Sequence, residues 1–335
     1  MAHRKPNSSF QAARGTNRRE SMRATSSRVF RALRPIVLYL YFPITAVLVL
    51  IHYPYGTDSD VVDTRSSQIG SASAFYEAAY RARPSATRGI SYEETAAQAA
   101  KDYDIEGQVR GFVTHHRLED KRVLEIGSGR GYLQDVVADY TGLDLSASVA
   151  PNYHKPFIVG SATAMPFADN TFDAAWTVWV VEHISTPEKA FEEMRRVVRP
   201  GGLLLLIVAW NCPPWLADGF AVRPYSDFNG AGKLVKASVS VRQSFLFSLT
   251  YLLPIRLARL AHYGVVEDAT RLRFRRLHPN YDVYWQADSD AAVSLDQFEL
   301  ILWFRSRGDT CLSCGSTADE FFKLGQSLVI RVNKG

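Results

Sequence analysis

The stretch that most constrains how this chain can fold is residues 123–131, which read VLEIGSGRG. Apolar residues at its start predict a strand, and the apolar spacing of residues 132–137 predicts a helix after it. Glycine at every second position predicts a tight loop between the two, because a Cβ would block left-handed backbone and the close approach of a ligand. A strand, a loop and a helix in this order predict an α/β fold that binds a ligand at the loop.

The spacing of the glycines narrows the kind of ligand. Loops that bind dinucleotides run G-x-G-x-x-G and place a pyrophosphate on the helix N-terminus. Here the loop runs E-x-G-x-G-x-G, and Tyr132 stands where a third glycine of that pattern would be. This pattern resembles motif I of the class I S-adenosylmethionine (SAM) dependent methyltransferases, and it disfavours a nicotinamide oxidoreductase. The resemblance implies SAM as the cofactor, with Glu125, Gly127 and Gly129 in its site; the alternative is a plain turn in an unrelated α/β protein.

Two later segments fit a nucleoside site. Residues 141–146 predict a second strand, and the carboxylate of Asp144 at its end can accept both hydroxyls of a ribose. The alternative for Asp144 is a cap on the next helix. Residues 160–167 resemble the adenine-binding turn of the same family, which normally reads Gly-Asp-Ala. Ser161 replaces that aspartate, so the resemblance implies an adenine contact through the Ser161 hydroxyl or through backbone groups near Ala162.

The order of the remaining elements predicts the fold class. Apolar runs at residues 157–159, 174–178 and 203–209 predict three more strands, and apolar residues at helical spacing predict a helix before the last of them. Strands that alternate with helices at these distances predict a doubly wound parallel α/β sheet.

The family resemblance covers about two-fifths of the chain. Residues 121–210 closely resemble the small-molecule class I methyltransferases, including those of quinone biosynthesis. The resemblance resumes with a helix after residue 294 and with strands near residues 309–314 and 326–332. It implies a Rossmann-like, doubly wound seven-stranded sheet with an antiparallel last strand.

His183 is the candidate for the general base. It follows the fourth predicted strand, and ligands of open α/β sheets bind at the carboxyl ends of the strands. A general base would take the proton of a hydroxyl acceptor; the alternative is that His183 fixes the strand-to-helix turn. Some relatives carry Glu-x-x-Glu-His here and hold a metal with it. Trp179 replaces the first glutamate, although Glu182 remains, so the resemblance implies no metal site. Trp176 and Trp179 are predicted either to line the acceptor pocket or to pack against other residues without a role in binding.

The N-terminal part of the chain differs from the rest in charge. Residues 1–35 hold nine Lys and Arg against Glu20 alone, whereas the remaining residues carry 30 basic and 33 acidic side chains. The body of the chain therefore lacks the basic excess of a nucleic-acid binder. In residues 1–34 the apolar residues do not recur at helix or strand spacing, which predicts a disordered basic tail. Residues 58–90 mix Asp, Ser, Arg and Gly and predict a linker.

Residues 35–57 are uncharged and predict a membrane segment, because their apolar run is close to the roughly 20 residues of a spanning helix. A buried core helix or a targeting peptide is the alternative. Positive charge before the segment keeps the N-terminus in the cytoplasm, and a full crossing would then export a domain whose cofactor is made in the cytosol. A segment bent at Pro43 and lying in the interface avoids this conflict. We expect a membrane-associated chain with its catalytic domain on the cytoplasmic face.

The predicted methyltransferase domain spans residues 91–335 and begins with a helical stretch to about His116. Residues 211–290 form an insertion that the family pattern does not explain. Apolar runs beside basic residues, as in 245–260, suit a membrane surface or an amphipathic acceptor, and the basic cluster at 271–276 could equally be a solvated face. The position of the insertion after the fifth strand predicts a cap over the acceptor.

These features predict SAM-dependent methyl transfer to a small-molecule or lipid-linked acceptor, by O-methylation, at a membrane surface. The alternative hypothesis is a non-catalytic SAM-fold binding module tethered to a membrane. It is motivated by Ser161 and Trp179, which depart from the family pattern.

Three cysteines cannot form a disulfide framework, which indicates a reducing compartment. Cys311 and Cys314 are interpreted as two small residues at a turn. A zinc or redox motif is the alternative.

Overall fold

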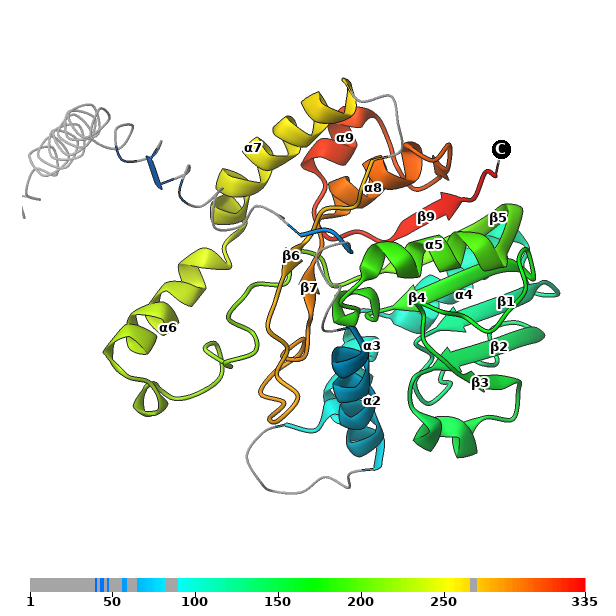
Figure 1. Cartoon of the computed structure of the whole chain (residues 1–335), viewed down its shortest axis with the longest axis horizontal. Coiled ribbons are helices and arrows are strands. Elements are labelled where there is room, and N and C mark those ends of the chain that lie inside the picture. Colours follow the sequence, from blue (N-terminus) through cyan, green and yellow to red (C-terminus); the bar gives the residue numbers. More distant parts are fainter. Residues whose placement is uncertain are drawn as a thin grey trace, which may run out of the picture. The chain divides into compact units, whose positions relative to one another are not determined.

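The computed structural model describes residues 40, 43, 44, 47, 56–58, 65–81, 90–265 and 270–334. The chain divides into two units, Met1–His52 and Tyr53–Gly335, and every helix and strand labelled in Figure 1 lies in the second. The predicted basic tail, residues 1–34, lies outside the described residues, as does most of the predicted membrane segment, residues 35–57.

Seven strands form one sheet in the order β3-β2-β1-β4-β5-β9-β8 (Figure 1). The strands are β1 Arg122–Ile126, β2 Asp139–Asp144, β3 Phe157–Val159, β4 Phe172–Val178, β5 Val198–Ile207, β8 Thr310–Cys311 and β9 Leu328–Arg331. Strands β1 to β5 pair in parallel, and β9 runs antiparallel to β5 and β8. This order confirms the predicted doubly wound sheet with an antiparallel last strand. The strand order reverses between β1 and β4, which is where open α/β sheets bind ligands.

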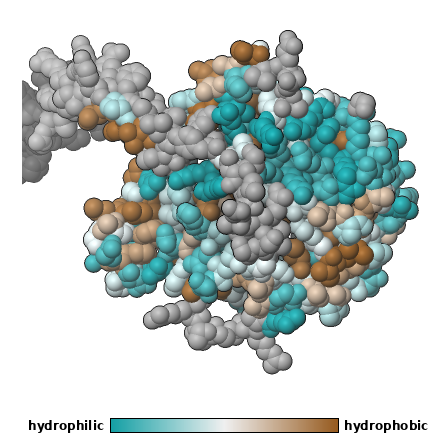
Figure 2. Space-filling view, viewed as in Figure 1, coloured by the Kyte–Doolittle hydropathy of each residue, from teal (hydrophilic) through white to brown (hydrophobic). Residues whose placement is uncertain are grey.

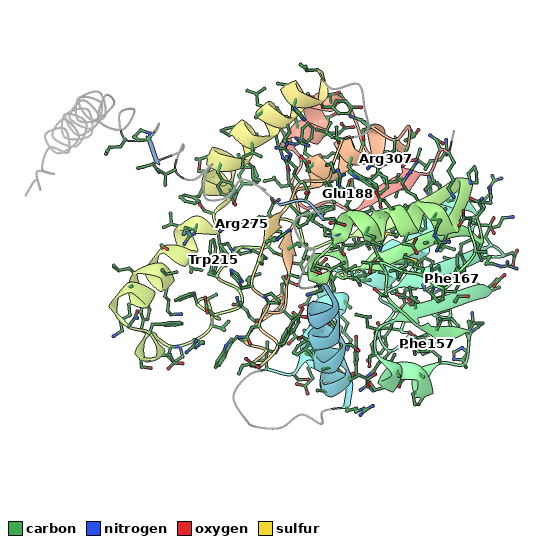
Figure 3. All side chains as sticks on the ribbon, viewed as in Figure 1. Phe157, Phe167, Glu188, Trp215, Arg275 and Arg307 are labelled. Carbon is green, nitrogen blue, oxygen red and sulfur yellow. A yellow bond between two sulfur atoms is a disulfide. The ribbon has the colours of Figure 1, made fainter. Side chains whose placement is uncertain are left out.

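Helices cover both faces of the sheet. They are α2 Arg65–Arg81, α3 Tyr92–Asp102, α4 Ile105–His116, α5 Pro187–Val197, α6 Gly230–Arg242, α7 Phe245–Tyr263, α8 Gln297–Arg305 and α9 Thr317–Phe322. Side chains of α5 and α8 pack on one face with Leu124 of β1, and side chains of α4 pack on the other face with Val123. Glu188 of α5 also accepts a hydrogen bond from Trp303 Nε1 of α8 at 2.8 Å and lies beside Arg307 (Figure 3).

The chain after the glycine loop differs from the sequence prediction. Residues 132–138 pass through turns directly to β2, so the helix predicted over 132–137 is wrong. The whole connection from β1 to β2 is residues 127–138, about the minimum length of a crossover, and the glycine loop takes its first five residues, so no room is left for a helix. The apolar residues behind that prediction, Leu133, Val136 and Val137, are buried by the turns instead.

The predicted helical stretch over residues 91–116 is two helices, α3 and α4. Ser91 caps α3, and its hydroxyl accepts the N–H of Glu94 at 3.3 Å. The break between α3 and α4 falls at Asp104, which has a left-handed φ of 47°. Aspartate tolerates this conformation better than most residues, so one residue redirects the chain.

Helix α2 lies within residues 58–90, so the prediction of a linker there is wrong for Arg65–Arg81. The helix runs beside α3 (Figure 1). Its Tyr76 is buried, and Glu77 accepts the N–H of Ser148 at 3.2 Å. The apolar residues of α2 do not form one stripe at helical spacing, and tertiary contacts stabilise the helix instead.

The predicted cap insertion contains α6 and α7. Among the described residues, no single helix is both long and apolar enough to cross a membrane. Helices α6 and α7 together meet the length and composition of a span, but they are bent by 84° at the break between them.

Two arginines of α7 are buried and do not lie at the surface beside its apolar run, and the membrane surface stays a prediction for this run. Arg256 and Arg259 are buried. Arg256 Nε donates to Asp296 Oδ2 at 2.9 Å, and Arg259 Nη2 donates to Glu299 Oε1 of α8 at 2.6 Å. These pairs attach the insertion to α8 and the residue that precedes it.

A disulfide joins Cys311, the last residue of β8, to Cys314 in the turn that follows. The interpretation as two small residues at a turn is right about the turn but misses the bond. Because the two sulfurs bind each other, they do not form a zinc site.

Candidate functional site

The glycine loop lies at the carboxyl end of β1. Gly127, Gly129 and Gly131 have left-handed φ values of 70°, 49° and 69°. A Cβ on Gly127 would lie 2.2 Å from Cγ2 of Val180, and one on Gly131 would lie 2.7 Å from the ring of Tyr153. Side chains larger than glycine are therefore excluded at both places, and Gly127 and Gly129 present bare backbone to a cavity.

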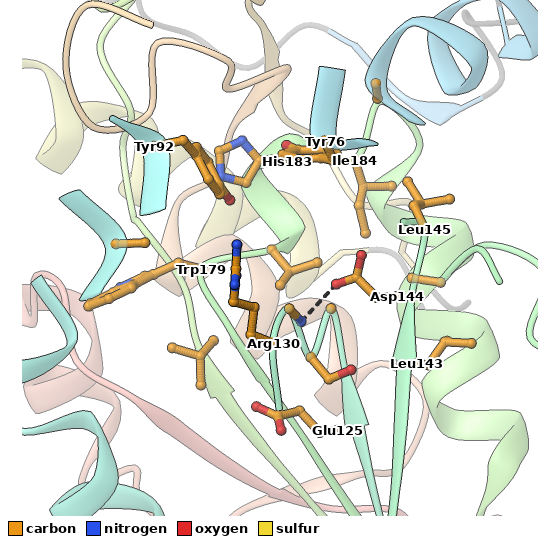
Figure 4. Close-up of a pocket in the computed structure, with 18 of the residues that line it drawn as sticks. Tyr76, Tyr92, Glu125, Arg130, Leu143, Asp144, Leu145, Trp179, His183 and Ile184 are labelled. Atoms are coloured by element: carbon orange, nitrogen blue, oxygen red, sulfur yellow. Dashed lines mark hydrogen bonds between the residues drawn. The ribbon is translucent and has the colours of Figure 1, made fainter. Parts of the chain in front are cut away.

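Asp144 ends β2 and lies beside this loop. Its Oδ2 accepts the N–H of Gly129 at 2.8 Å, and its Oδ1 accepts the N–H of Ser146 at 3.0 Å (Figure 4). Burial raises the pKa of Asp144, although the backbone N–H groups oppose this. A carboxylate offers about four lone-pair sites, so two remain for a ribose. Asp144 thus holds both the loop and the turn after β2, and it also lines the cavity.

Glu125 lies at the floor of the same cavity and is 5% exposed. Its Oε2 accepts the hydroxyl hydrogen of Tyr140. Burial raises the pKa of Glu125 to about 7, and the hydrogen bond from Tyr140 opposes this shift. Glu125 is therefore partly protonated near neutral pH, and a cationic ligand would favour its ionised form.

This pKa predicts how stability depends on pH. Between pH 4.5 and about 7, the folded chain holds a proton on Glu125 that the unfolded chain has released. The free energy of unfolding therefore falls as the pH rises through this window, by on the order of 3 kcal/mol. Urea unfolding of Glu125→Gln and wild type at about pH 5 and about pH 8 checks this. We expect the variant to lose this part of the pH dependence, and an equal dependence in both proteins would contradict the assignment.

Ser161 and Ala162 lie in the wall of the cavity after β3. The Ser161 hydroxyl lies 2.9 Å from the Thr163 hydroxyl and accepts the N–H of Thr163 at 3.2 Å. The hydroxyl thus holds its own turn, and an adenine contact by Ser161 stays a prediction.

Helices α2 and α3 add aromatic residues that the sequence analysis did not assign. Tyr76 and Tyr80 of α2 and Tyr92 of α3 line the cavity, with Tyr92 edge-to-face against each of the other two at 5.8 Å between ring centroids. Arg130 of the loop donates to the carbonyl oxygen of Tyr80 at 2.9 Å and pairs with Glu93. The signal in the sequence was the tyrosine spacing in α2, which its linker-like composition obscured.

The cavity has a volume of about 630 Å³, which is in the usual range for a small-molecule site. Figure 4 shows Glu125 and Asp144 toward one end, and His183 with Tyr76 and Tyr92 toward the other. The cavity therefore joins the predicted cofactor residues to the predicted general base.

His183 ends a short 3-10 helix, Val181–His183, that follows β4. Its Nδ1 lies 3.3 Å from Asp290 Oδ2, and its Nε2 lies 4.0 Å from Glu182 Oε1. The hydroxyl of Tyr76 donates to Asp290 Oδ2 at 2.8 Å. Asp288 lies close as well, because one donor atom from each of Glu182, His183 and Asp288 lies within 4.8 Å of the other two.

The carboxylates around His183 control its proton. Burial alone would lower the pKa of His183, but Asp290, Glu182 and Asp288 outweigh burial and raise it to about 9. Burial raises the pKa of Glu182 to about 7 and also raises that of Asp288. Asp288 and Asp290 could not be predicted from the sequence as neighbours of His183, because they lie far from it along the chain.

Comparison with known proteins identifies the class. Residues 124–206 match the family described as a methyltransferase domain. A demethylmenaquinone methyltransferase of Renibacterium salmoninarum is 38% identical over 95 residues, covering 26% of this chain and 40% of that protein. Malonyl-[acyl-carrier protein] O-methyltransferase 1 of Coxiella burnetii is 27% identical over 157 residues, covering 41% of this chain and 56% of that protein. These matches confirm the predicted resemblance to the class I SAM-dependent methyltransferases for residues 124–206, which carry the glycine loop, and they support SAM as the cofactor.

The similarity is partial. The chain spans 40% and 56% of the length of these two relatives, and the match at residues 124–206 leaves out the insertion. Among solved structures, SAM-bound CalS10, an amino pentose methyltransferase from Micromonospora echinaspora, is 19% identical, covers 34% of this chain and 56% of its own, and has a TM-score of 0.30. A TM-score this low supports no further conclusion.

Proposed function

We propose that this chain transfers the methyl group of SAM to an oxygen atom of a small-molecule or lipid-linked acceptor. The observation that supports the proposal is that the glycine loop, Asp144 and His183 line the same cavity. SAM supplies an electrophilic methyl group on a sulfonium. The chain must therefore align the acceptor with that methyl group, and it must remove the proton of the acceptor hydroxyl.

The acceptor end of the cavity is aromatic and polar. Tyr76, Tyr92 and Tyr281 line it, and they suit the apolar body of an acceptor. We assign proton removal to His183, as expected from the sequence, because it lies in the wall of the cavity at the acceptor end. Its pKa of about 9 means that the neutral imidazole, the form that can take a proton, becomes the major form only above that pH. Methylation at oxygen is further supported by the name of the Coxiella burnetii relative, an O-methyltransferase.

Membrane association belongs to the same proposal. Apolar side chains reach the surface over α6 and α7 (Figure 2). The most exposed of these are Leu234, Val241, Phe245, Leu246 and Leu257. Exposed apolar side chains on adjacent helices suit a bilayer surface or a lipid-linked acceptor. The basic excess before residue 35 favours the cytoplasmic face for the catalytic domain.

Calorimetric titration of the full chain with S-adenosylhomocysteine tests the cofactor site. We expect binding on the order of micromolar. Gly129→Arg should abolish it, because its side chain would start from left-handed backbone 3.2 Å from the Tyr80 hydroxyl. Gly111→Arg is the matched control, since Gly111 on α4 faces open space. A folded wild-type chain that does not bind would overturn the proposal.

Two further arms of this experiment test the acceptor and the membrane. Methyl-labelled SAM is incubated with the chain and with the lipid and water-soluble fractions of a cell extract. Label in the lipid fraction identifies a lipid-linked acceptor, and turnover in either fraction excludes the non-catalytic module. Sedimentation with anionic vesicles, compared between wild type and Phe245→Glu, tests the membrane surface, and equal sedimentation would contradict it.

A further inference from the structure

We propose that Glu182, His183 and Asp288 form a binding site for a divalent cation at the acceptor end of the cavity. Glu182 and His183 follow β4, whereas Asp288 lies between α7 and α8, outside the methyltransferase match at residues 124–206. One donor atom from each residue lies within 4.8 Å of the other two. Donor atoms on opposite sides of a bound cation lie about 4 to 5 Å apart, so the three side chains can share one ion.

Buried negative charge around His183 exceeds the positive charge available. Glu182 and Asp290 are fully buried, and Asp288 is half-buried. Within the described part of the chain, His183 is the only cationic side chain that pairs with any of these carboxylates. If all three carboxyl groups are ionised, one protonated imidazole does not balance them, and an uncompensated buried carboxylate costs several kcal/mol. A divalent cation supplies the missing charge.

A buried oxygen of Glu182 lacks a partner. Its Oε1 accepts the N–H of Ala209 at a long 3.4 Å, while its Oε2 has no hydrogen bond among the described residues. Asp290 Oδ1 is likewise buried without a hydrogen-bond partner. Buried polar atoms in folded proteins nearly always have one, and coordination of a cation would satisfy the Glu182 oxygen.

Asp290 lies beside His183 as carboxylates lie beside metal-binding histidines, although Nδ1 makes no hydrogen bond to the residues that the structure describes. The imidazole Nδ1 lies 3.3 Å from Asp290 Oδ2, and that oxygen accepts the Tyr76 hydroxyl hydrogen at 2.8 Å. A carboxylate on one ring nitrogen directs the other toward a metal. The other nitrogen, Nε2, lies 4.0 Å from Glu182 Oε1, a separation that an ion bound at about 2.1 Å from each atom would bridge.

The ligand set and its position indicate the kind of ion and its role. Two carboxylates and one imidazole suit Mn²⁺ or Zn²⁺. This inference rests on the proposed function and deepens it. It replaces the general-base role assigned above to His183, because with an ion bound His183 would be a ligand and the ion would lower the pKa of an acceptor hydroxyl. The sequence predicts no metal, because Trp179 replaces the first glutamate of the family pattern. The position of Asp288 beside Glu182 and His183 is visible only in the structure.

The test is calorimetric titration of Mn²⁺ and Zn²⁺, separately, into the metal-stripped full chain, with Mn²⁺ binding also followed by electron paramagnetic resonance. We expect one site with a dissociation constant below about 100 μM. Glu182→Gln and Asp288→Asn should each weaken binding by about tenfold or more. Asp288 has a φ of 60°, which asparagine also tolerates. Asp282→Asn, exposed in the same segment, is the matched control and should bind as the wild type does.

Titration of the same samples with S-adenosylhomocysteine separates the two proposals. A wild-type chain that binds S-adenosylhomocysteine but neither metal overturns the cation site alone. A chain that binds metal but not S-adenosylhomocysteine overturns the proposed function. Equal metal affinity in all variants also overturns the site, because the ion then lies elsewhere. If Glu182→Gln does not fold, the metal affinity of Asp288→Asn tests the site, because Asp288 is only half-buried.

Discussion

Replacing Asp144 with alanine is expected to weaken the binding of S-adenosylhomocysteine by about 100-fold or more. The carboxylate of Asp144 holds the N–H groups of Gly129 and Ser146 and keeps lone pairs for a ribose. Hydrogen bonds to a charged group contribute about 1.5 to 3 kcal/mol each, so losing two ribose contacts gives an effect of this size. Calorimetric titration of the variant measures it.

Asp139→Ala is the control for this prediction. Asp139 begins the same strand, its side chain is 52% exposed, and it pairs with Arg122 away from the cavity. This substitution should leave the affinity unchanged. An Asp144→Ala chain that binds like the wild type would show that Asp144 only supports the loop.

Arg259→Met is expected to destabilise the chain by about 3 to 5 kcal/mol, because it leaves the carboxylate of Glu299 buried without its partner. The urea midpoint and the melting temperature measure this loss. The double variant Arg259→Met with Glu299→Gln should recover most of it. Glutamine removes the buried charge and keeps an oxygen that can accept the N–H of Arg273, which now bonds Glu299 at 3.1 Å.

Arg110→Met provides the comparison at the surface. Arg110 and Glu106 pair on α4 with side chains 53% and 60% exposed, and such pairs contribute only about 0.5 kcal/mol. Similar losses in Arg110→Met and Arg259→Met would contradict the view that the insertion is attached to the domain through buried ion pairs.

The cofactor half of the site could be predicted because its signals are local. Gly127 and Gly129 need left-handed backbone, and that requirement is visible in the sequence as glycine at a fixed spacing. Asp144 ends a strand parallel to β1, so its distance along the chain placed it beside the loop. The helix predicted over residues 132–137 failed, because apolar spacing shows which residues are buried but not whether the chain has room for a helix.

The sequence by itself determined the class I fold, the glycine loop and the strand that carries Asp144, because these follow from short-range patterns of apolar residues and glycine. Only the tertiary structure decided what surrounds the acceptor. Tyr76 binds Asp290 beside His183 from a segment that resembles a linker, and Asp288 and Asp290 reach His183 from the end of the insertion. No periodicity records such contacts, because they arise when separate segments pack on the carboxyl end of one sheet.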